Sequence, residues 1–190
     1  NLQGIQGFTN LKKLTCYSNQ LTVLDMSYNL MLEELNCAYN LITSLNISNN
    51  LELTELYCSS NLLTTLDVSN NVLLNSIYIN LNQISNIDLS NNITLTGISC
   101  YSNSLTALDV SNNLDLLRLR CDSNFLTAID VSSNLSLRRL SIGSNQISNI
   151  DLSNNLELIQ FIGHSNLFTS LDISNNVDLE HLKCNNNSLP

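Results

Sequence analysis

The sequence predicts a solenoid, in which short units of equal length stack along one axis. Two observations carry this prediction: a 21-residue repeat without insertions, and an alternation of apolar residues inside each unit. The pattern Leu-Asp-Met-Ser at 24–27 returns as Leu-Asn-Ile-Ser at 45–48 and recurs every 21 residues up to 171–174. Self-similarity at a fixed short period is the signature of a repeat architecture.

The composition agrees with a short repeat whose turns are built from asparagine. The 190 residues include 33 Asn and 39 Leu, but only one Pro and five Gly. Because Gly and Pro are common turn residues and are scarce here, Asn has to supply most of the turns. Charged residues make up 12% of the chain, which is too few for a coiled coil or a disordered acidic protein.

One half of each unit predicts a short strand. The pattern Leu-x-x-Leu-x-Cys-x-x-Asn-x-Leu occupies 11–21 and recurs at 53–63, and its alternating apolar residues are typical of a half-buried strand. Stacked in register, such strands form a curved right-handed parallel β-sheet, whose outward residues line a concave face. The short period leaves room only for short 3-10 or extended segments on the convex face.

These residues resemble the leucine-rich repeat, whose unit reads L-x-x-L-x-L-x-x-N/C-x-L over about 20–29 residues. They are similar to the cysteine-containing repeats of bacterial internalin-like surface proteins, in which L-T-x-L-D-V-S-x-N follows the cysteine. Residues 5–11, Ile-Gln-Gly-Phe-Thr-Asn-Leu, also resemble the opening coil of that family. The resemblance covers essentially the whole chain and implies a leucine-rich-repeat solenoid.

We expect residues 1–190 to form a single solenoid of about nine 21-residue units. Residues 1–10 hold only part of a unit and are expected to form a partial opening coil, whereas 180–190 are expected to be a truncated last unit. Natural arrays carry polar caps at their ends. We therefore expect the chain to be a fragment of a longer protein, with caps, signal and anchor outside it.

Two asparagine rows are predicted to satisfy the backbone at the turns of each coil. The first row, where the chain leaves the sheet, is Asn19, Asn40, Asn61, Asn82, Asn103, Asn124, Asn145, Asn166 and Asn187. The second row, at the outer turn, is Asn29, Asn50, Asn71, Asn92, Asn113, Asn134, Asn155 and Asn176. We expect both rows to be structural.

The cysteines are predicted to be buried free thiols. They share one repeat position with Ile79, Ile142 and Gly163, and exchange with Ile at a core position favours a small hydrophobic residue. A disulfide between adjacent coils and a metal site are the alternatives. The six residues are Cys16, Cys37, Cys58, Cys100, Cys121 and Cys184.

An aspartate ladder is predicted to cap backbone amides in the Ser-x-Asn turn that follows each aspartate. Replacement of one member by the neutral Asn46 supports that interpretation, and calcium held between coils is the alternative. The ladder comprises Asp25, Asp67, Asp88, Asp109, Asp130, Asp151 and Asp172.

Function is expected where the repeat does not dictate the residue, at the outward positions three, five and seven of each unit. Tyr57 and Tyr78 are direct neighbours and Tyr101 follows on the next strand, so they predict either cross-strand packing or an exposed aromatic binding patch. The full set of candidate ligand-binding residues on the concave face is Tyr57, Tyr78, Tyr101, Arg118, Arg120, Arg139, Ile162 and Lys183.

Charge distinguishes the concave face from the rest of the molecule. Arg118, Arg120 and Arg139 cluster on adjacent strands, where like charges destabilise a sheet, so folding alone does not require them. The outward positions carry a net charge of +2, whereas the whole chain carries -9. This contrast favours an anionic partner, either an acidic protein surface or a sulfated or sialylated glycan. A solvated face without a ligand is the alternative.

The sequence offers no support for an enzyme. His164 and His181 lie on neighbouring strands, about 13 Å apart along the strand direction, without a nucleophile and an orienting group beside them. We expect no catalytic residues, no metal and no cofactor. The net negative charge opposes nucleic-acid binding, and no apolar run approaches the about 18 residues that span a bilayer.

These observations predict a non-enzymatic module for macromolecular recognition or adhesion through the concave face. By the resemblance, it would belong to a bacterial surface or secreted protein, outside the cell, that binds a protein or anionic glycan on a host or other cell. We expect a monomer. The alternative is a targeting or spacer array attached to an enzyme or adhesin domain elsewhere in the protein.

Overall fold

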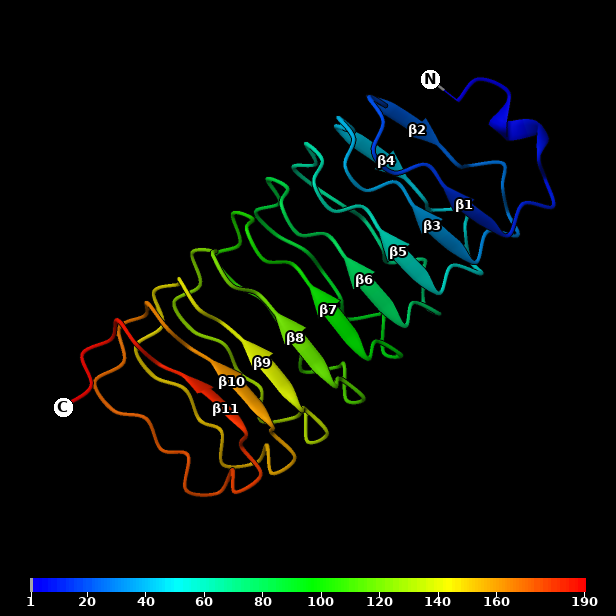
Figure 1. The fold of residues 1–190 in the computed structure, drawn as a ribbon. Coiled ribbons are helices and arrows are strands. Elements are labelled where there is room, and N and C mark those ends of the chain that lie inside the picture. The colour runs from blue at the N-terminus through cyan, green and yellow to red at the C-terminus, as the bar shows by residue number, and fades with distance from the viewer. Residues whose placement is uncertain (1) are drawn as a thin grey trace.

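A computed structural model describes residues 2–190 and shows a curved stack of coils, one above another (Figure 1). One side of the stack is a nine-stranded parallel sheet in the order β1-β3-β5-β6-β7-β8-β9-β10-β11. The strands are three residues each: β1 Lys13–Thr15, β3 Glu34–Asn36, β5 Glu55–Tyr57, β6 Ser76–Tyr78, β7 Gly97–Ser99, β8 Arg118–Arg120, β9 Arg139–Ser141, β10 Gln160–Ile162 and β11 His181–Lys183. The parallel repeat solenoid predicted from the sequence is confirmed.

The rest of each coil contains almost no regular structure. A 3-10 helix, η1 (Ile5–Gly7), lies in the opening coil, and β2 (Val23–Asp25) and β4 (Ser44–Asn46) form a separate two-stranded parallel sheet. Extended segments and turns complete the other coils, as the short period predicts. Within residues 2–190 there is no helix that is both long and apolar enough to cross a membrane.

Strand pairing follows the sequence repeat in register, so equivalent residues of successive coils lie side by side. Leu35 pairs with Leu56, and Leu56 with Ile77, each 21 residues apart. These central strand residues are fully buried, while their neighbours on both sides face outward. A single apolar core therefore runs the length of the stack.

All six thiols are free, and five of them lie in this core, whereas Cys184 of the last coil is only partly buried. Burial raises the pKa of Cys58 to about 12, because a thiolate would lose its hydration in the interior. Gly163 replaces cysteine in one coil because a side chain there would meet the ring of Phe161, whose Cζ would lie 2.7 Å from its Cβ. Phe161 and Phe168 fill the space instead.

The first asparagine row joins each coil to the coil before it. Asn61 donates to the carbonyls of Cys37 and Cys58 at 3.1 Å each, and its side-chain oxygen accepts from the Ile42 amide at 2.9 Å. The second row is more deeply buried than the first, and Asn71 donates to the Ile47 and Asn50 carbonyls at 3.0 and 2.8 Å. Both rows thus have the structural role expected of them.

The residue before each asparagine of the first row has a left-handed backbone in all nine coils, with φ between 53° and 58°. Most of these residues are serine, but Tyr39 and Leu81 also adopt this conformation. A side chain with a Cβ pays for it in steric energy, and bulky residues are unusual there. The stacking of the coils therefore imposes this turn conformation, even on residues that do not favour a left-handed backbone.

The aspartate ladder caps the turn that follows it. Asp88 accepts from the Ser90 amide at 2.9 Å, and Asn46 accepts from the Ser48 amide at 3.1 Å in the equivalent place. Hydrogen bonds from the Ser90 backbone and side chain lower the pKa of Asp88. Among residues 2–190, no three His, Cys, Asp or Glu side chains gather in a group that could hold a metal ion.

Candidate functional site

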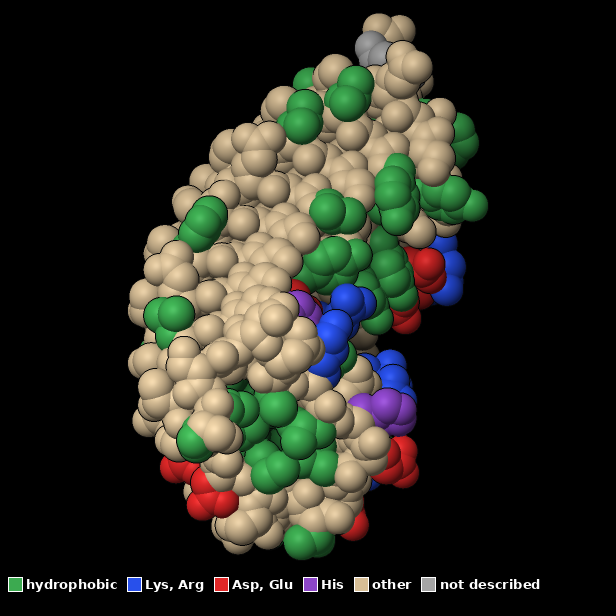
Figure 2. Space-filling model, turned by 60° about the vertical axis from the view of Figure 1, so that its left-hand side comes forward, with side chains coloured by type: hydrophobic (Ala, Val, Ile, Leu, Met, Phe, Trp, Pro, Cys, Tyr) green, Lys and Arg blue, Asp and Glu red, His purple; other side chains and the backbone are tan. Residues whose placement is uncertain are grey.

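The concave face of the sheet carries the candidate residues. Figure 2 shows the curvature of the molecule, with Lys, Arg and His side chains gathered along the inner curve. Each strand presents its first and third residue to this face, because the middle residue points into the core. Neighbours on the face are therefore set by the 21-residue register.

Tyr57 and Tyr78 form a parallel stack on β5 and β6. Their ring centroids are 4.8 Å apart and the planes differ by 9°. The Tyr57 hydroxyl donates to the Glu55 carboxylate, and this bond together with partial burial raises the pKa of Tyr57. The two rings therefore pack across the strands, as one of the two interpretations predicts, and both residues remain only half-buried.

Tyr101 belongs to a second cluster, with Arg120. It follows β7 by two residues, and the Arg120 guanidinium carbon lies 4.6 Å from the centroid of its ring. This is a cation–π contact, which orients the guanidinium along the face. Arg120 Nε also lies 4.0 Å from an Asp122 carboxylate oxygen, so its charge is partly balanced.

Asp122 is itself held by the neighbouring strand. Its Oδ1 accepts from the Ser141 hydroxyl and from the Gly143 amide. Gly143 also makes room for His164, whose Nε2 would lie 2.7 Å from a Cβ at that position. Asp122 therefore contributes to the order of the face.

Arg118 and Arg139 are register partners on β8 and β9, so their side chains leave the sheet side by side. Neither makes an ion pair within residues 2–190, whereas Lys13 pairs with Glu34 at 2.8 Å. The unbalanced positive charge is accordingly concentrated around β8 and β9. At the β1–β5 end, the outward residues include Glu34 and Glu55, so the face is polarised along its length.

Ile162 and Lys183 do not join these clusters. They are register partners on β10 and β11, and Ser141 of β9 lies between Ile162 and Arg120 in the row. The structure therefore divides the eight candidates into a tyrosine stack, an arginine group with Tyr101, and a separate pair near the last strand.

Comparison with solved structures shows the family. The functional domain of InlJ from Listeria monocytogenes, described as including a cysteine ladder, matches with a TM-score of 0.98 and 38% identity over 100% of this chain. The chain is a leucine-rich-repeat protein. Its repeats are internalin-like, with the cysteine row predicted from the sequence. The chain spans 42% of that InlJ structure, which is less than half its length.

Two further structures share the leucine-rich-repeat fold. A protein from Leptospira interrogans, LIC12759, matches with a TM-score of 0.92 and 21% identity, over 98% of this chain and 52% of its own. The plant peptide hormone receptor RGFR1, in complex with RGF2, matches with a TM-score of 0.85 and 24% identity, over 97% of this chain and 33% of its own. No family model matches the chain, and neither does any curated protein.

The structure adds a feature that the analysis of single residues missed, a hollow of about 490 Å³ on the concave face of this leucine-rich-repeat protein. Gly97 and Ser99 of β7 form its floor, and Tyr78, Arg118 and Arg120 are among the residues around it. The signal was available in the sequence, because both outward residues of one strand are small while their neighbours on the next strand are large.

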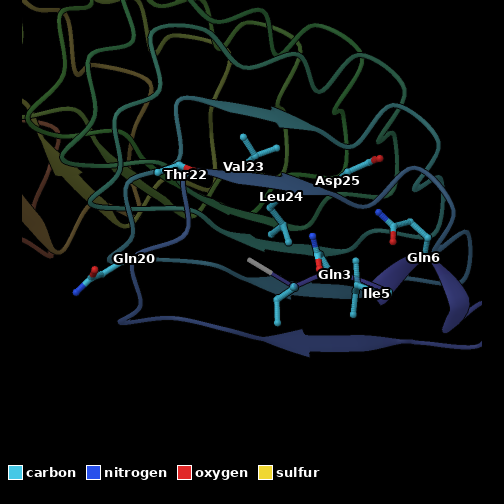
Figure 3. A pocket seen from close by; sticks show the side chains of 10 residues that line it. Gln3, Ile5, Gln6, Gln20, Thr22, Val23, Leu24 and Asp25 are labelled. Atoms are coloured by element: carbon cyan, nitrogen blue, oxygen red, sulfur yellow. The ribbon is translucent and has the colours of Figure 1, made fainter.

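A hollow of about 360 Å³ at the N-terminal end of the molecule has no comparable chemistry. Figure 3 shows that its side chains come from the opening coil and the segment around β2, with Leu24 pointing towards Gln3 and Ile5 and Val23 pointing away from them. Its one charged residue, Asp25, already caps the Ser27 amide at 3.0 Å. The hollow over β7 is therefore the better candidate site.

Proposed function

We propose that this protein recognises another macromolecule through its concave face and catalyses no reaction. The observation that carries the proposal is the pair of neighbouring arginines, Arg118 and Arg139, which have no ion pair within residues 2–190. Like charges side by side cost stability in a sheet, so a requirement outside folding accounts for them better. An anionic partner would supply the missing counter-charge.

The relatives support recognition rather than chemistry. RGFR1 is a peptide hormone receptor in complex with RGF2 and has the same fold. The internalin-like repeats, shared with InlJ, support a bacterial surface or secreted protein, and a location outside the cell belongs to this proposal. We further propose that the partner is an acidic protein or an anionic glycan on a host or other cell, and that the chain acts as a monomer.

The proposed binding face comprises both clusters described above. The tyrosine stack supplies rigid aromatic area, and the arginines supply charge-assisted hydrogen bonds. Ile162 and Lys183 extend the face towards the last strand. The proposed residues are Tyr57, Tyr78, Tyr101, Arg118, Arg120, Arg139, Ile162 and Lys183.

The proposal is tested by probing an array of host-cell proteins and sulfated or sialylated glycans with the purified 190-residue chain. For any partner retained, the double variant Arg118→Ala/Arg120→Ala should weaken binding by about tenfold or more, because charged hydrogen bonds are lost. Arg138→Ala is the matched control, since Arg138 precedes β9 and pairs with Glu157 at 3.1 Å. Equal binding by the double variant and the control would contradict the proposal.

A further inference from the structure

The hollow over β7 is built by the sizes of residues in two adjacent rows. In the row of first strand residues, Gly97 lies between Ser76 and Arg118. In the row of third strand residues, Ser99 lies between Tyr78 and Arg120. Small side chains at both outward places of one strand leave the space that their larger neighbours enclose.

The wall on the β6 side is an aromatic ring with one face available. Tyr57 covers one face of the Tyr78 ring in the parallel stack. On the opposite side the row continues with Ser99, which is too small to cover a ring, and Tyr78 lines the hollow. An aromatic face is electron-rich, so it attracts groups with partial positive charge, such as the C–H bonds of a sugar ring.

The floor offers an oriented amide. Asn80 is 7% exposed and lines the hollow, and its side-chain oxygen accepts from the hydroxyls of Ser59 and Ser99 at 2.9 and 3.2 Å. Within residues 2–190, the Asn80 amide nitrogen has no hydrogen-bond acceptor, so its donors are available to a ligand. This nitrogen is not among the fully buried atoms that lack a partner, so solvent, and therefore a ligand, can reach it.

The wall on the β8 side carries a positive charge that is not neutralised. Arg118 makes no ion pair within the described residues, while Arg120 is held between Tyr101 and Asp122. A guanidinium binds a carboxylate with two parallel hydrogen bonds, which fixes orientation as well as charge. The hollow therefore combines an aromatic face, an amide donor and a carboxylate-binding group around about 490 Å³.

We propose that this hollow binds a carboxylated sugar residue, of the uronic or sialic acid type, in a glycan. The ring would pack on Tyr78, its hydroxyls would bond Asn80 and Ser99, and its carboxylate would pair with Arg118. The volume lies within the about 300–1,000 Å³ of small-ligand sites. The polar floor lacks the apolar pocket in which a peptide anchors a large side chain, so the hollow fits a sugar better than an acidic peptide. This inference deepens the proposed function and depends on it.

The decisive experiment fills the hollow without disturbing the fold. In Gly97→Val, the new Cβ would meet only Ser76 Oγ, at 3.6 Å, and Val is favoured in strands. Binding of methyl glucuronide and of N-acetylneuraminic acid to the full chain is followed by NMR titration, with methyl glucoside as the neutral match. We expect about tenfold tighter binding of the acids than of the glucoside, and loss of that binding in Gly97→Val and Arg118→Ala. Arg138→Ala should bind as the wild type does.

Two outcomes would overturn this inference. If the acids bind Gly97→Val as well as they bind the wild type, the hollow is not their site. If neither acid binds, but a Glu-rich peptide binds and depends on Arg118, the ligand is an acidic protein, and the proposed function stands without the sugar. Absence of binding to the sugars, the peptide and the array together would remove both proposals.

Discussion

The interior of each coil and its concave face lie a few residues apart but obey different rules. In the interior, Asn103 donates to Ile79 and Cys100 carbonyls at 3.0 and 3.1 Å and accepts from the Ile84 amide at 3.0 Å. On the face, Arg118 is paired in register with Arg139, which places two like charges on neighbouring strands. Stacking makes neighbours of equivalent residues in both regions. In the interior these neighbours hydrogen-bond to one another and stabilise the fold, whereas on the face two neighbours repel each other and lower the stability.

The largest effect that this comparison predicts is the loss of an inner asparagine. Asn103→Ala leaves the buried Ile84 amide without an acceptor, which costs about 1–3 kcal/mol. It also removes one of the two asparagine hydrogen bonds to each of the Ile79 and Cys100 carbonyls. We expect the free energy of unfolding to fall by about 3 kcal/mol, measured by urea denaturation. Asn112→Ala, at an exposed asparagine with one 3.3 Å bond, should change it by about 0.5 kcal/mol or less. Equal losses would show that burial does not separate the two kinds of asparagine.

Relief of backbone strain at the turn should have a smaller effect, in the opposite direction. Leu81 has φ 58° and a side chain that is 43% exposed, so little packing is lost when it is replaced. Asn tolerates the left-handed region, so Leu81→Asn should stabilise the protein by about 1 kcal/mol. Thermal denaturation checks this, with Leu62→Asn as the control, because Leu62 is similarly exposed but does not have a left-handed backbone. An unchanged melting temperature would mean that the turn carries no strain.

Removal of one arginine from the face should also stabilise the protein. Arg139→Gln removes the like charge beside Arg118 on the next strand, and two charges about 5 Å apart repel by about 0.8 kcal/mol in water. We expect a gain of about 0.5 kcal/mol in low salt that disappears at high salt, because exposed charges are screened. Arg138→Gln should give no gain, since it breaks the pair with Glu157. A loss of stability in Arg139→Gln would assign that side chain to folding instead of binding.

The smallest effect concerns acid stability. Hydrogen bonds from Ser90 hold the pKa of Asp88 below its ordinary value in the folded state. The stabilisation of the folded state by the Asp88 carboxylate is therefore fully present above the unfolded pKa of about 3.9 and is lost as the pH falls through the folded pKa. Asp88→Asn keeps the cap, as Asn46 does, without titrating. The melting temperature of the variant should fall less between pH 5 and pH 2.5, and an identical fall would argue against the cap.

Much of the candidate site could be predicted because register fixes neighbours. The contact of Tyr57 with Tyr78 and the adjacency of Arg118 and Arg139 follow from a step of 21 residues. The orientation of Arg120 could not be predicted, because it depends on how its long side chain divides between Tyr101 and Asp122. A repeat pattern contains no information about side-chain torsions.

The sequence by itself determined the period, the parallel register, the buried cysteine row and the asparagine rows. Each of these depends only on equal spacing, since residues at equal spacing must meet when coils stack. Only the tertiary structure decided where the face is hollow and where its charge is unpaired. Those properties depend on the sizes and torsions of side chains from three adjacent strands at once, and no single unit contains them.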